Sequence, residues 1–229
     1  MKYTATLPLP GADRDVVLDL DNHCISDPYT PGATCPIGDA EITPEHLHIT
    51  AMVGRTAFLF DGDACPEGYA LTFTTHETIP LDPGTRLRGE TGALAGEYLV
   101  GVYSPGGVKE NHFVIEQTET GYTGEMYGLV DEKTLAFMQS MTAGGPGAMP
   151  PDAPPMEPKP LPKLGDKMDL NPFSSVTGSA EHFEVITFTG MGSEFRFAGS
   201  IHGDEIAMTL HVTDSHTGIL AKAHNPNPG

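Results

Sequence analysis

Tryptophan is absent from the 229-residue sequence, and aromatic residues as a whole make up only 7% of it. Stacking of sugar rings or nucleobases on aromatic side chains is therefore not expected. Basic residues are also scarce: 12 Lys and Arg stand against 31 Asp and Glu, which gives a formal net charge of −19. Nucleic acids and anionic membranes both require a basic surface, so we expect neither as a partner. The acidity favours solubility in general and, for a ligand, a cation or a divalent metal.

Cysteine is rare too, and the three cysteines, Cys24, Cys35 and Cys65, form no Cys-x-x-Cys pair. The sequence thus predicts neither a disulfide framework nor a zinc ribbon. No stretch approaches the roughly 18 apolar residues that span a bilayer, and the N-terminus lacks the continuous apolar segment of a signal peptide. We therefore expect a cytoplasmic protein with reduced thiols, whose oligomeric state the sequence leaves open.

Several catalytic motifs are missing. The sequence has no glycine-rich nucleotide-binding motif, no Walker loop, no Gly-x-Ser-x-Gly and no His-Glu-x-x-His. Nucleotide-dependent chemistry, an α/β-hydrolase and a zinc protease are accordingly not expected. We expect no cofactor, and any catalysis would have to be acid–base chemistry by His, Glu, Tyr or Arg.

The sequence does contain a series of short alternating segments, separated by turn residues, that are typical of β-strands. The predicted strands are 46–52, 56–60, 69–76, 97–103, 112–118, 123–129, 182–189, 194–201, 205–213 and 218–223. Asp61-Gly62-Asp63 and Gly203-Asp204 are predicted to be hairpin turns, and Asp131 can cap one short helix. In residues 1–41 only 3–7 and 16–20 resemble strands, so this segment is expected to be otherwise irregular. The fold class predicted is all-β, with one antiparallel domain over residues 1–229.

Residues 142–172 form a proline-rich insertion in this pattern, with nine of the 21 prolines between Pro146 and Pro172. Proline has no backbone N–H and favours extended conformations, which excludes a central strand here. The insertion is either a loop on the surface or a lid, because it carries apolar side chains that a simple spacer would not need. These are Met149, Met156, Leu161, Leu164 and Met168.

Two segments share a rhythm of strand, polar glycine turn and strand. The first comprises Gly96-Glu97-Tyr98-Leu99-Val100, Phe113-Val114-Ile115-Glu116 and Gly121-Tyr122-Thr123-Gly124-Glu125. The second comprises Phe183-Glu184-Val185-Ile186, Phe195-Arg196-Phe197-Ala198-Gly199 and the hairpin at Gly203-Asp204. This rhythm resembles the meandering barrels of the lipocalin-like (calycin) family, over residues 96–128 and 181–223. The resemblance implies a β-barrel that binds a small apolar ligand, and some such barrels act as isomerases, lyases or cyclases.

The polar faces of the predicted strands carry Thr, His and occasional Arg in place of the many Lys and Glu of a solvated face. Either these faces are partly enclosed, or they form an ordinary outer face with the apolar residues inside. His46 and His48 lie two apart on one strand, as paired metal ligands must, and His76 or His211 would complete a three-histidine site if the sheet brought it near.

Other candidates are defined by residue type. Arg196 points away from its neighbours Phe195 and Phe197, so it either stabilises a carboxylate or enolate or pairs with Glu194 or Glu205. Candidate ligand-binding residues are Arg55, Tyr98, Tyr103, Tyr127 and Thr209.

Three functional hypotheses follow. The leading one is a barrel that encloses a small apolar or amphipathic molecule, either as a binder or as a cofactor-independent isomerase, lyase or hydratase. In the enzymatic version His48, His76 or His211 moves a proton and Arg196 stabilises developing negative charge. The alternatives are a divalent-metal protein that uses His46 and His48, and an interaction protein whose proline-rich segment docks a partner.

Overall fold

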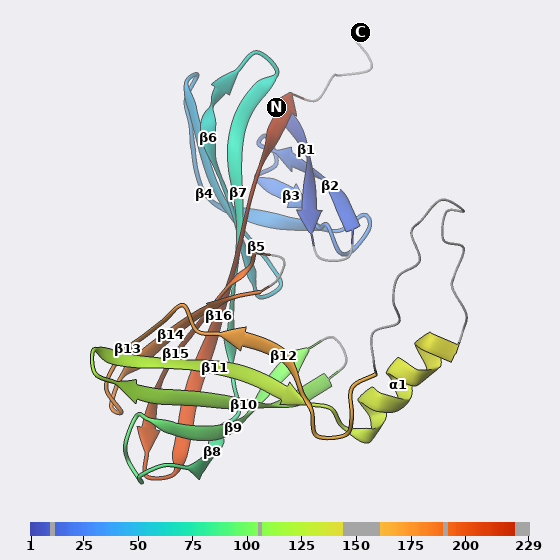
Figure 1. The fold of residues 1–229 in the computed structure, drawn as a ribbon. Coiled ribbons are helices and arrows are strands. Elements are labelled where there is room, and N and C mark those ends of the chain that lie inside the picture. The colour runs from blue at the N-terminus through green and yellow to red at the C-terminus, as the bar shows by residue number, and fades with distance from the viewer. Residues whose placement is uncertain (10–11, 105–106, 144–160, 190–191, 223–229) are drawn as a thin grey trace, which may run out of the picture. The chain divides into compact units, whose positions relative to one another are not determined.

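The chain folds into antiparallel β-structure with one short helix (Figure 1). The computed structural model describes residues 1–229 except 10–11, 105–106, 144–160, 190–191 and 223–229. The strands are β1 (Lys2–Leu9), β2 (Ala12–Asp19), β3 (Cys24–Ser26), β4 (Thr34–Ile42), β5 (His46–Val53), β6 (Thr56–Cys65), β7 (Gly68–Pro80), β8 (Gly84–Arg88), β9 (Gly96–Ser104), β10 (Gly107–Thr118), β11 (Gly121–Leu129), β12 (Lys167–Pro172), β13 (Ser175–Gly178), β14 (Phe183–Phe188), β15 (Glu194–His202) and β16 (Glu205–Lys222). The helix is α1 (Glu132–Ala143), and the Asp131 carboxylate caps it by accepting a hydrogen bond from the Thr134 amide at 2.7 Å.

The residues divide into two compact units. Unit 1 comprises Met1–Pro80, Phe188–Phe197 and Thr209–Gly229, and unit 2 comprises Leu81–Thr187 and Ala198–Met208. Both units draw residues from β15 and β16. The single domain expected from the sequence therefore stays a prediction.

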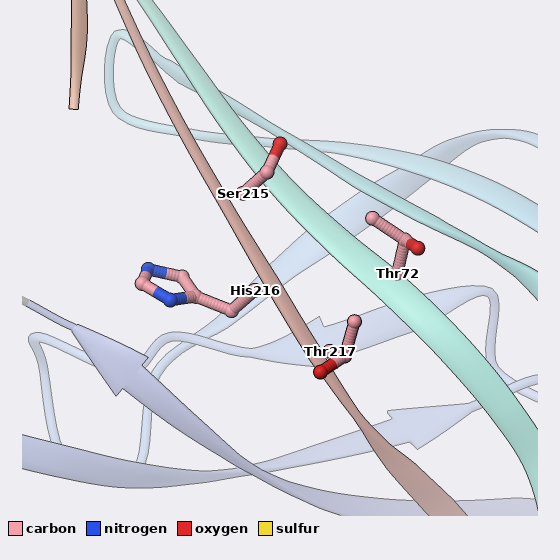
Figure 2. A pocket seen from close by; sticks show the side chains of 4 residues that line it. All are labelled: Thr72, Ser215, His216 and Thr217. Atoms are coloured by element: carbon pink, nitrogen blue, oxygen red, sulfur yellow. The ribbon is translucent and has the colours of Figure 1, made fainter. Parts of the chain in front are cut away.

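Unit 1 contains a ring of strands. Neighbours along the chain pair from β1 to β7, β7 pairs with β16, and β16 pairs back to β1 through Tyr3 and Thr4. Figure 2 shows β16 beside β7, with Thr72 of β7 near Ser215 and Thr217 of β16. Because side chains alternate along each strand, one face of the ring is mostly apolar and buried while the other is mostly polar.

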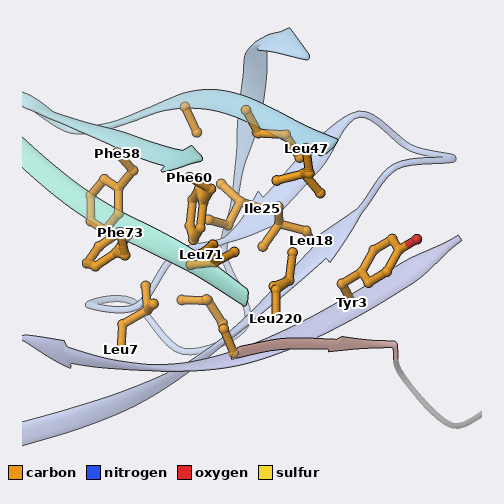
Figure 3. Close-up of a cluster of buried hydrophobic side chains, with 14 of the residues drawn as sticks. Tyr3, Leu7, Leu18, Ile25, Leu47, Phe58, Phe60, Leu71, Phe73 and Leu220 are labelled. Carbon is orange, nitrogen blue, oxygen red and sulfur yellow. The ribbon is translucent and has the colours of Figure 1, made fainter. Parts of the chain in front are cut away.

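The apolar face of unit 1 forms a packed aromatic and aliphatic core (Figure 3). The rings of Phe58 and Phe60 lie 5.5 and 5.2 Å from the ring of Phe73, in tilted arrangements. Leu18, Ile25, Leu47 and Leu220 complete the cluster. The Phe60 side chain has no solvent exposure.

In unit 2 the strand order runs from β12 through β11, β10, β9 and β8 to β16, and from β16 through β15 and β14 to β13. β12 and β13 do not pair, but only residues 173–174 separate them along the chain. The amide of Phe173 donates to Gly124 of β11, and the amide of Ser174 donates to Ile186 of β14. Residues 173 and 174 thus connect β12 and β13, the two strands at opposite ends of the strand order of unit 2.

One loop of unit 2 is held by a buried arginine. The Arg86 side chain is 3% exposed, and its guanidinium donates to the carbonyls of Ala95 and Ala93 at 3.1 and 2.6 Å. The same guanidinium lies 4.7 Å from the centroid of the Tyr98 ring. The Tyr98 hydroxyl donates to the Ala93 and Leu94 carbonyls, so both side chains stabilise the loop before β9.

Much of the secondary structure predicted from the sequence is confirmed, including the all-β antiparallel class, the short helix and the hairpin at Gly203-Asp204. The hairpin turn predicted at Asp61-Gly62-Asp63 is wrong. These residues lie within β6, and the chain turns at Pro66–Glu67 between Cys65 and Gly68. The N-terminal segment also contains more strand than expected, because β3 and β4 pair despite Pro36 and Gly38, with a bulge in β4.

The proline-rich insertion stays a prediction, since residues 144–160 lie outside the described part. Its last six residues, Lys167–Pro172, form strand β12, which pairs with β11.

We expect Phe60→Ala to lower the free energy of unfolding by about 3–5 kcal/mol, because it leaves a cavity among side chains that are fully buried. Chemical denaturation monitored by circular dichroism measures this. Met52→Ala, at a side chain that is half exposed on a neighbouring strand, is the control and should change stability by less than about 0.5 kcal/mol. A loss at Phe60 no larger than that of the control would contradict the packed core.

Candidate functional site

A group of ionisable side chains in unit 2 lies on the outer face of β9, β10 and β11. On the inner face, Tyr98 and Met126 both lie opposite Phe113 in the strand register, and all three are buried. The alternation of strand side chains therefore puts Glu97, His112 and Tyr127 together on the opposite face. We call Glu97, His112 and Tyr127 the acid–base cluster.

The members of the acid–base cluster are in direct contact. Nδ1 of His112 lies 2.7 Å from Oε1 of Glu97, and the Tyr127 hydroxyl donates to the same oxygen at 3.3 Å. The His112 and Tyr127 rings stack in parallel with centroids 4.9 Å apart. Lys167 of β12 covers the outer side of Tyr127, with Nζ 3.9 Å from the ring centroid and 2.5 Å from Oε1 of Glu125.

Burial and charge shape the protonation of this cluster. The side chains of Glu97 and His112 are only 15% and 16% exposed. Burial acts to raise the pKa of Glu97, but the His112 hydrogen bond and the Arg88 charge outweigh it and hold this pKa below its ordinary value. Burial, and then the charge of Glu97, raises the pKa of Tyr127. Glu97 is thus kept ionised and Tyr127 protonated.

A hollow of about 260 Å³ adjoins the cluster. Its lining residues are Val114, Glu116, Thr123, Gly124 and Glu125. In the strand register Val114 lies opposite Glu97 on one side and Glu125 on the other, so the hollow and the cluster form one continuous surface. Small-molecule sites generally measure about 300–1,000 Å³, so this hollow suits a small ligand or one group of a larger ligand.

The arrangement is suited to proton transfer. When Nδ1–H of His112 donates to the Glu97 carboxylate, the imidazole is held in the tautomer whose Nε2 can accept a proton. Among the described residues, Nε2 of His112 makes no hydrogen bond. Tyr127 adds a protonated hydroxyl beside it, so an acid and a base lie next to the hollow.

Two of the histidines predicted from the sequence come together in unit 1. His76 and His211 stack with centroids 5.6 Å apart. The Thr78 hydroxyl lies 3.4 Å from Nε2 of His76 and 3.2 Å from Nδ1 of His211, and the Thr213 hydroxyl lies 3.1 Å from Nδ1 of His76. The residues on this face are half-exposed or exposed, so they occupy an outer face with the apolar side chains inside.

His46 and His48 lie elsewhere, beside two aspartates of β6. Nδ1 of His48 is 2.7 Å from Oδ2 of Asp61, and Nδ1 of His46 is 3.0 Å from Oδ1 of Asp63. The hydrogen bond to Asp63 raises the pKa of His46.

The third histidine expected at that site is missing from it. His48 lies opposite Asp61, and His76 lies opposite Ala57, four residues earlier on β6. This separates the two histidines by about 13 Å along the strand direction. Among the described residues no group of three or more His, Cys, Asp or Glu side chains is arranged to hold a metal ion.

The remaining sequence candidates are dispersed. Tyr98 is fully buried under Arg86 and holds a loop. Arg196 pairs with Glu194 at 3.1 Å, which is one of the two outcomes expected for it. Arg55 is exposed and 3.6 Å from Glu77. Thr209 is half-buried on β16, whereas the side chain of Tyr103 lies outside the described residues.

Sequence reasoning named only Tyr127 of the acid–base cluster. It missed Glu97, His112 and, beside them, Lys167 and Glu125. A signal was present, because Glu97, His112 and Tyr127 each precede or follow a predicted inward-facing aromatic or Met residue by one position. Pairing three consecutive strands in register would have placed them on one surface.

No protein-family model, no curated protein and no solved structure matches the chain. The lipocalin-like resemblance thus has no support beyond the antiparallel strands and their ring. Among the described residues no helix is long and apolar enough to cross a membrane.

We expect Glu97→Gln to destabilise the protein at neutral pH by about 1–3 kcal/mol, because it removes a charged hydrogen-bond acceptor that is largely buried. The pKa of Glu97 is lower in the folded than in the unfolded protein, so its contribution is present above the unfolded value and lost as pH falls through the folded value. Urea unfolding at several pH values should show the difference between wild type and variant shrinking on acidification below about 4.5. A difference that is constant with pH would contradict this linkage. Glu116→Gln, at an exposed side chain, is the control.

Proposed function

We propose that the protein binds a small polar molecule carrying a cationic group, in the hollow beside the acid–base cluster of unit 2. In its enzymatic form it is a cofactor-independent isomerase, lyase or hydratase. His112 then accepts a proton from the bound molecule and Tyr127 supplies one. Glu97 orients His112 and stabilises the imidazolium as it forms.

The observation that carries this proposal is the contact of 2.7 Å between His112 and a Glu97 side chain that is mostly buried. An isolated buried carboxylate is costly, and here His112 and Tyr127 both donate to the Glu97 carboxylate. A histidine held by a carboxylate, with a tyrosine stacked on it and a hollow beside it, matches the combination of groups that acid–base sites require.

The charge of the hollow argues for a cationic ligand. Glu116 and Glu125 line it, Glu97 lies next to it, and the chain as a whole carries −19. Lys167 neutralises part of Glu125, and Glu116 is left as the exposed carboxylate. This changes the ligand class expected from the sequence, which was apolar or amphipathic, to a polar one.

We also propose that the ring of unit 1 is a meandering barrel of the lipocalin-like kind. Its eight strands pair in chain order and the last, β16, pairs with the first. Its inward side chains fill the interior, which is why we assign the ligand to unit 2. Cytoplasmic localisation stays part of the proposal, and the absence of any disulfide among the three cysteines is consistent with it.

The binding proposal is tested by nuclear magnetic resonance. The panel consists of small carbon skeletons, and each skeleton is supplied as three separate compounds: an amine, a carboxylic acid and a neutral alcohol. We expect the amines to shift the amide signals of Val114, Thr123 and Glu125 and to lose about tenfold in affinity in Glu116→Gln. Thr74→Val, on a strand of unit 1, is the control and should leave binding unchanged. Binding by the acids or alcohols alone, or shifts confined to unit 1, would contradict the proposal.

A second candidate, a divalent-metal protein, rests on one observation. Oδ2 of Asp61 lies 2.7 Å from a ring nitrogen of His48 and 3.7 Å from Nε2 of His46, so it replaces the third histidine expected there. The 2.7 Å contact is a hydrogen bond, because donors about 2.0–2.2 Å from a tetrahedral ion lie roughly 3.3–3.6 Å apart, so a bound ion would have to displace the shared proton. Against it stands the absence of any recognised metal-binding group in the described residues.

The metal candidate makes its own prediction. If it is right, the purified protein contains about one zinc or similar ion per chain by elemental analysis, and both His48→Ala and Asp61→Asn remove it. His76→Ala is the control, because that residue lies elsewhere on the sheet. Metal content near zero in the wild type after incubation with zinc and desalting would exclude this candidate.

The third hypothesis, an interaction protein that docks a partner through its proline-rich segment, stays a prediction. The segment lies mostly outside the described residues. Deleting residues 146–160 and measuring both partner binding and the melting temperature would test it.

A further inference from the structure

In the part of the chain that the structure describes, one edge of β16 has no neighbouring strand over part of its length. Backbone N–H and C=O groups along a strand point alternately to its two edges. The pair that flanks a two-residue hairpin turn is hydrogen bonded, so Gly68 points its groups to Cys65 of β6. The backbone groups of Phe73 and of the other odd-numbered residues of β7 then point to β16. His216 lies opposite Phe73, so its backbone groups point back to β7.

The groups of Ser215, Thr217 and Ile219 consequently point to the edge away from β7. Two other hairpins also direct the backbone groups of odd-numbered β16 residues to the edge away from β7. Leu9 faces Ala12 across the β1–β2 turn, which directs Thr4 towards its partner on β16, Ala221. His202 and Glu205 flank the turn between β15 and β16, which directs the odd-numbered residues of β16 to the same edge.

Two strands, β15 and β1, pair with this edge of β16, and between them lies a stretch without a partner among the described residues. The hairpin register places Glu194, the first residue of β15, opposite Thr213, so β15 reaches no further. β1 pairs with β16 only at Ala221 and Lys222. Within the described residues, no strand pairs with this edge over 215–219. We call the opening between 215–219 of β16 and 5–8 of β1 the seam.

The sequence of β1 explains why the seam does not close. Continuing the register of β1 on β16 would bring Pro8 opposite Thr217. Proline has no N–H to donate, so the ladder would lose a hydrogen bond there. β1 pairs with β2 over its whole length through its other edge, so this pairing neither opens nor closes the seam.

Residues 215–219 include no Lys, Arg, Asp or Glu, and Ser215, His216 and Thr217 give this stretch polar side chains. A hollow of about 420 Å³ lies at the β16 side, lined by Thr72, Ser215, His216 and Thr217. His216 projects from β16 on the side away from β7 (Figure 2). Strand edges open to solvent are usually protected by lysine, proline or a bulge, and residues 215–219 contain none of these.

We propose that the seam receives an extended segment of another protein, which adds as a strand to β16. Three N–H and three C=O groups, from Ser215, Thr217 and Ile219, are available to it. Its inward side chains would lie near Leu7 and Gly218 and are small or apolar. Its outward side chains would lie near Thr6, whose hydroxyl donates to Asp15 at 2.7 Å, and are basic.

The negative net charge of the chain decides whether the added strand comes from a second copy of this chain or from a different protein. A second copy of this chain would bring another −19 to an edge flanked by Asp15 and Asp214, and the two copies would repel. In a segment that alternates apolar and basic residues, the apolar side chains can pack inwards. The basic side chains are attracted by the negative charge of the protein. The occupant we propose is therefore a basic extended segment of a different chain.

The probe is a fluorescently labelled peptide of four Val-Lys repeats, with four Val-Glu repeats as the charge control. We expect the Val-Lys peptide to bind at low salt with micromolar affinity and the Val-Glu peptide to bind at least tenfold more weakly. Fluorescence anisotropy measures this. Hydrogen exchange should show the amides of Thr217 and Ile219 exchanging fast in the protein alone and at least tenfold more slowly with the peptide.

Two variants separate strand addition from binding in the hollow. Thr217→Pro removes an N–H that points to the open edge, without removing a bond to β7, and should weaken the peptide at least tenfold. Thr217→Val keeps that N–H and removes only the hydroxyl, and should change affinity less than twofold. A Val-Lys peptide with alternate amides N-methylated gives the same test without altering the protein, and should not bind.

The proposal is overturned if the Val-Lys peptide does not bind at millimolar concentration. It is equally overturned if Thr217→Pro or N-methylation leaves affinity unchanged, or if the protein self-associates through this edge in the absence of any peptide. Loss of binding in Thr217→Val as large as in Thr217→Pro would assign the site to the hydroxyl-lined hollow, and strand addition would be wrong.

Discussion

The backbone of β16 is the constraint on which the architecture depends. Along its 18 residues it pairs with four strands: β8 at Glu205 and Ile206, β7 over 214–221, and also β15 and β1. Side chains at even-numbered positions face inwards. They are buried at Ile206, Leu210 and Leu220, but only half-buried from Val212 to His216. Burial already falls at Val212, which β15 still covers, and returns at Leu220, next to the residues that pair with β1, so the loss of burial only overlaps the unpaired stretch 215–219.

The same alternation produces the acid–base cluster. Tyr98, Phe113 and Met126 are buried inside unit 2, which leaves Glu97, His112 and Tyr127 on the outer face in register. Burying a carboxylate there would be unfavourable alone, and His112, Arg88 and Tyr127 each offset part of that cost. Each of the three side chains therefore depends on the other two, because truncating one of them would leave a largely buried polar group without its partner.

Sequence alone predicted the elements better than their assembly. Alternation located most strands after Ile42, and the glycine at 203 located a hairpin. It failed at Asp61-Gly62-Asp63, since turn-forming residues also fit a strand whose Gly62 backbone packs against Ala70 and Leu71 of β7. The histidine pair His76 and His211, 135 positions apart, could be suggested but not placed. Convergence of Glu97 with His112 depends on strand register, which the residue pattern does not encode until the neighbouring strand is known.

The negative charge of the protein acts differently at the two proposed binding surfaces. At the hollow of unit 2 the carboxylates lie in direct contact range of a ligand, so attraction acts at short distance and partly in a desolvated setting. At the seam recognition rests mainly on backbone hydrogen bonds, and the net charge of −19 acts largely as a long-range field, with Asp15 and Asp214 flanking the edge. Such a field decays over about 8–10 Å at ordinary ionic strength. Added salt should accordingly slow association at the seam without changing dissociation much, whereas at the hollow it should weaken the bound state itself.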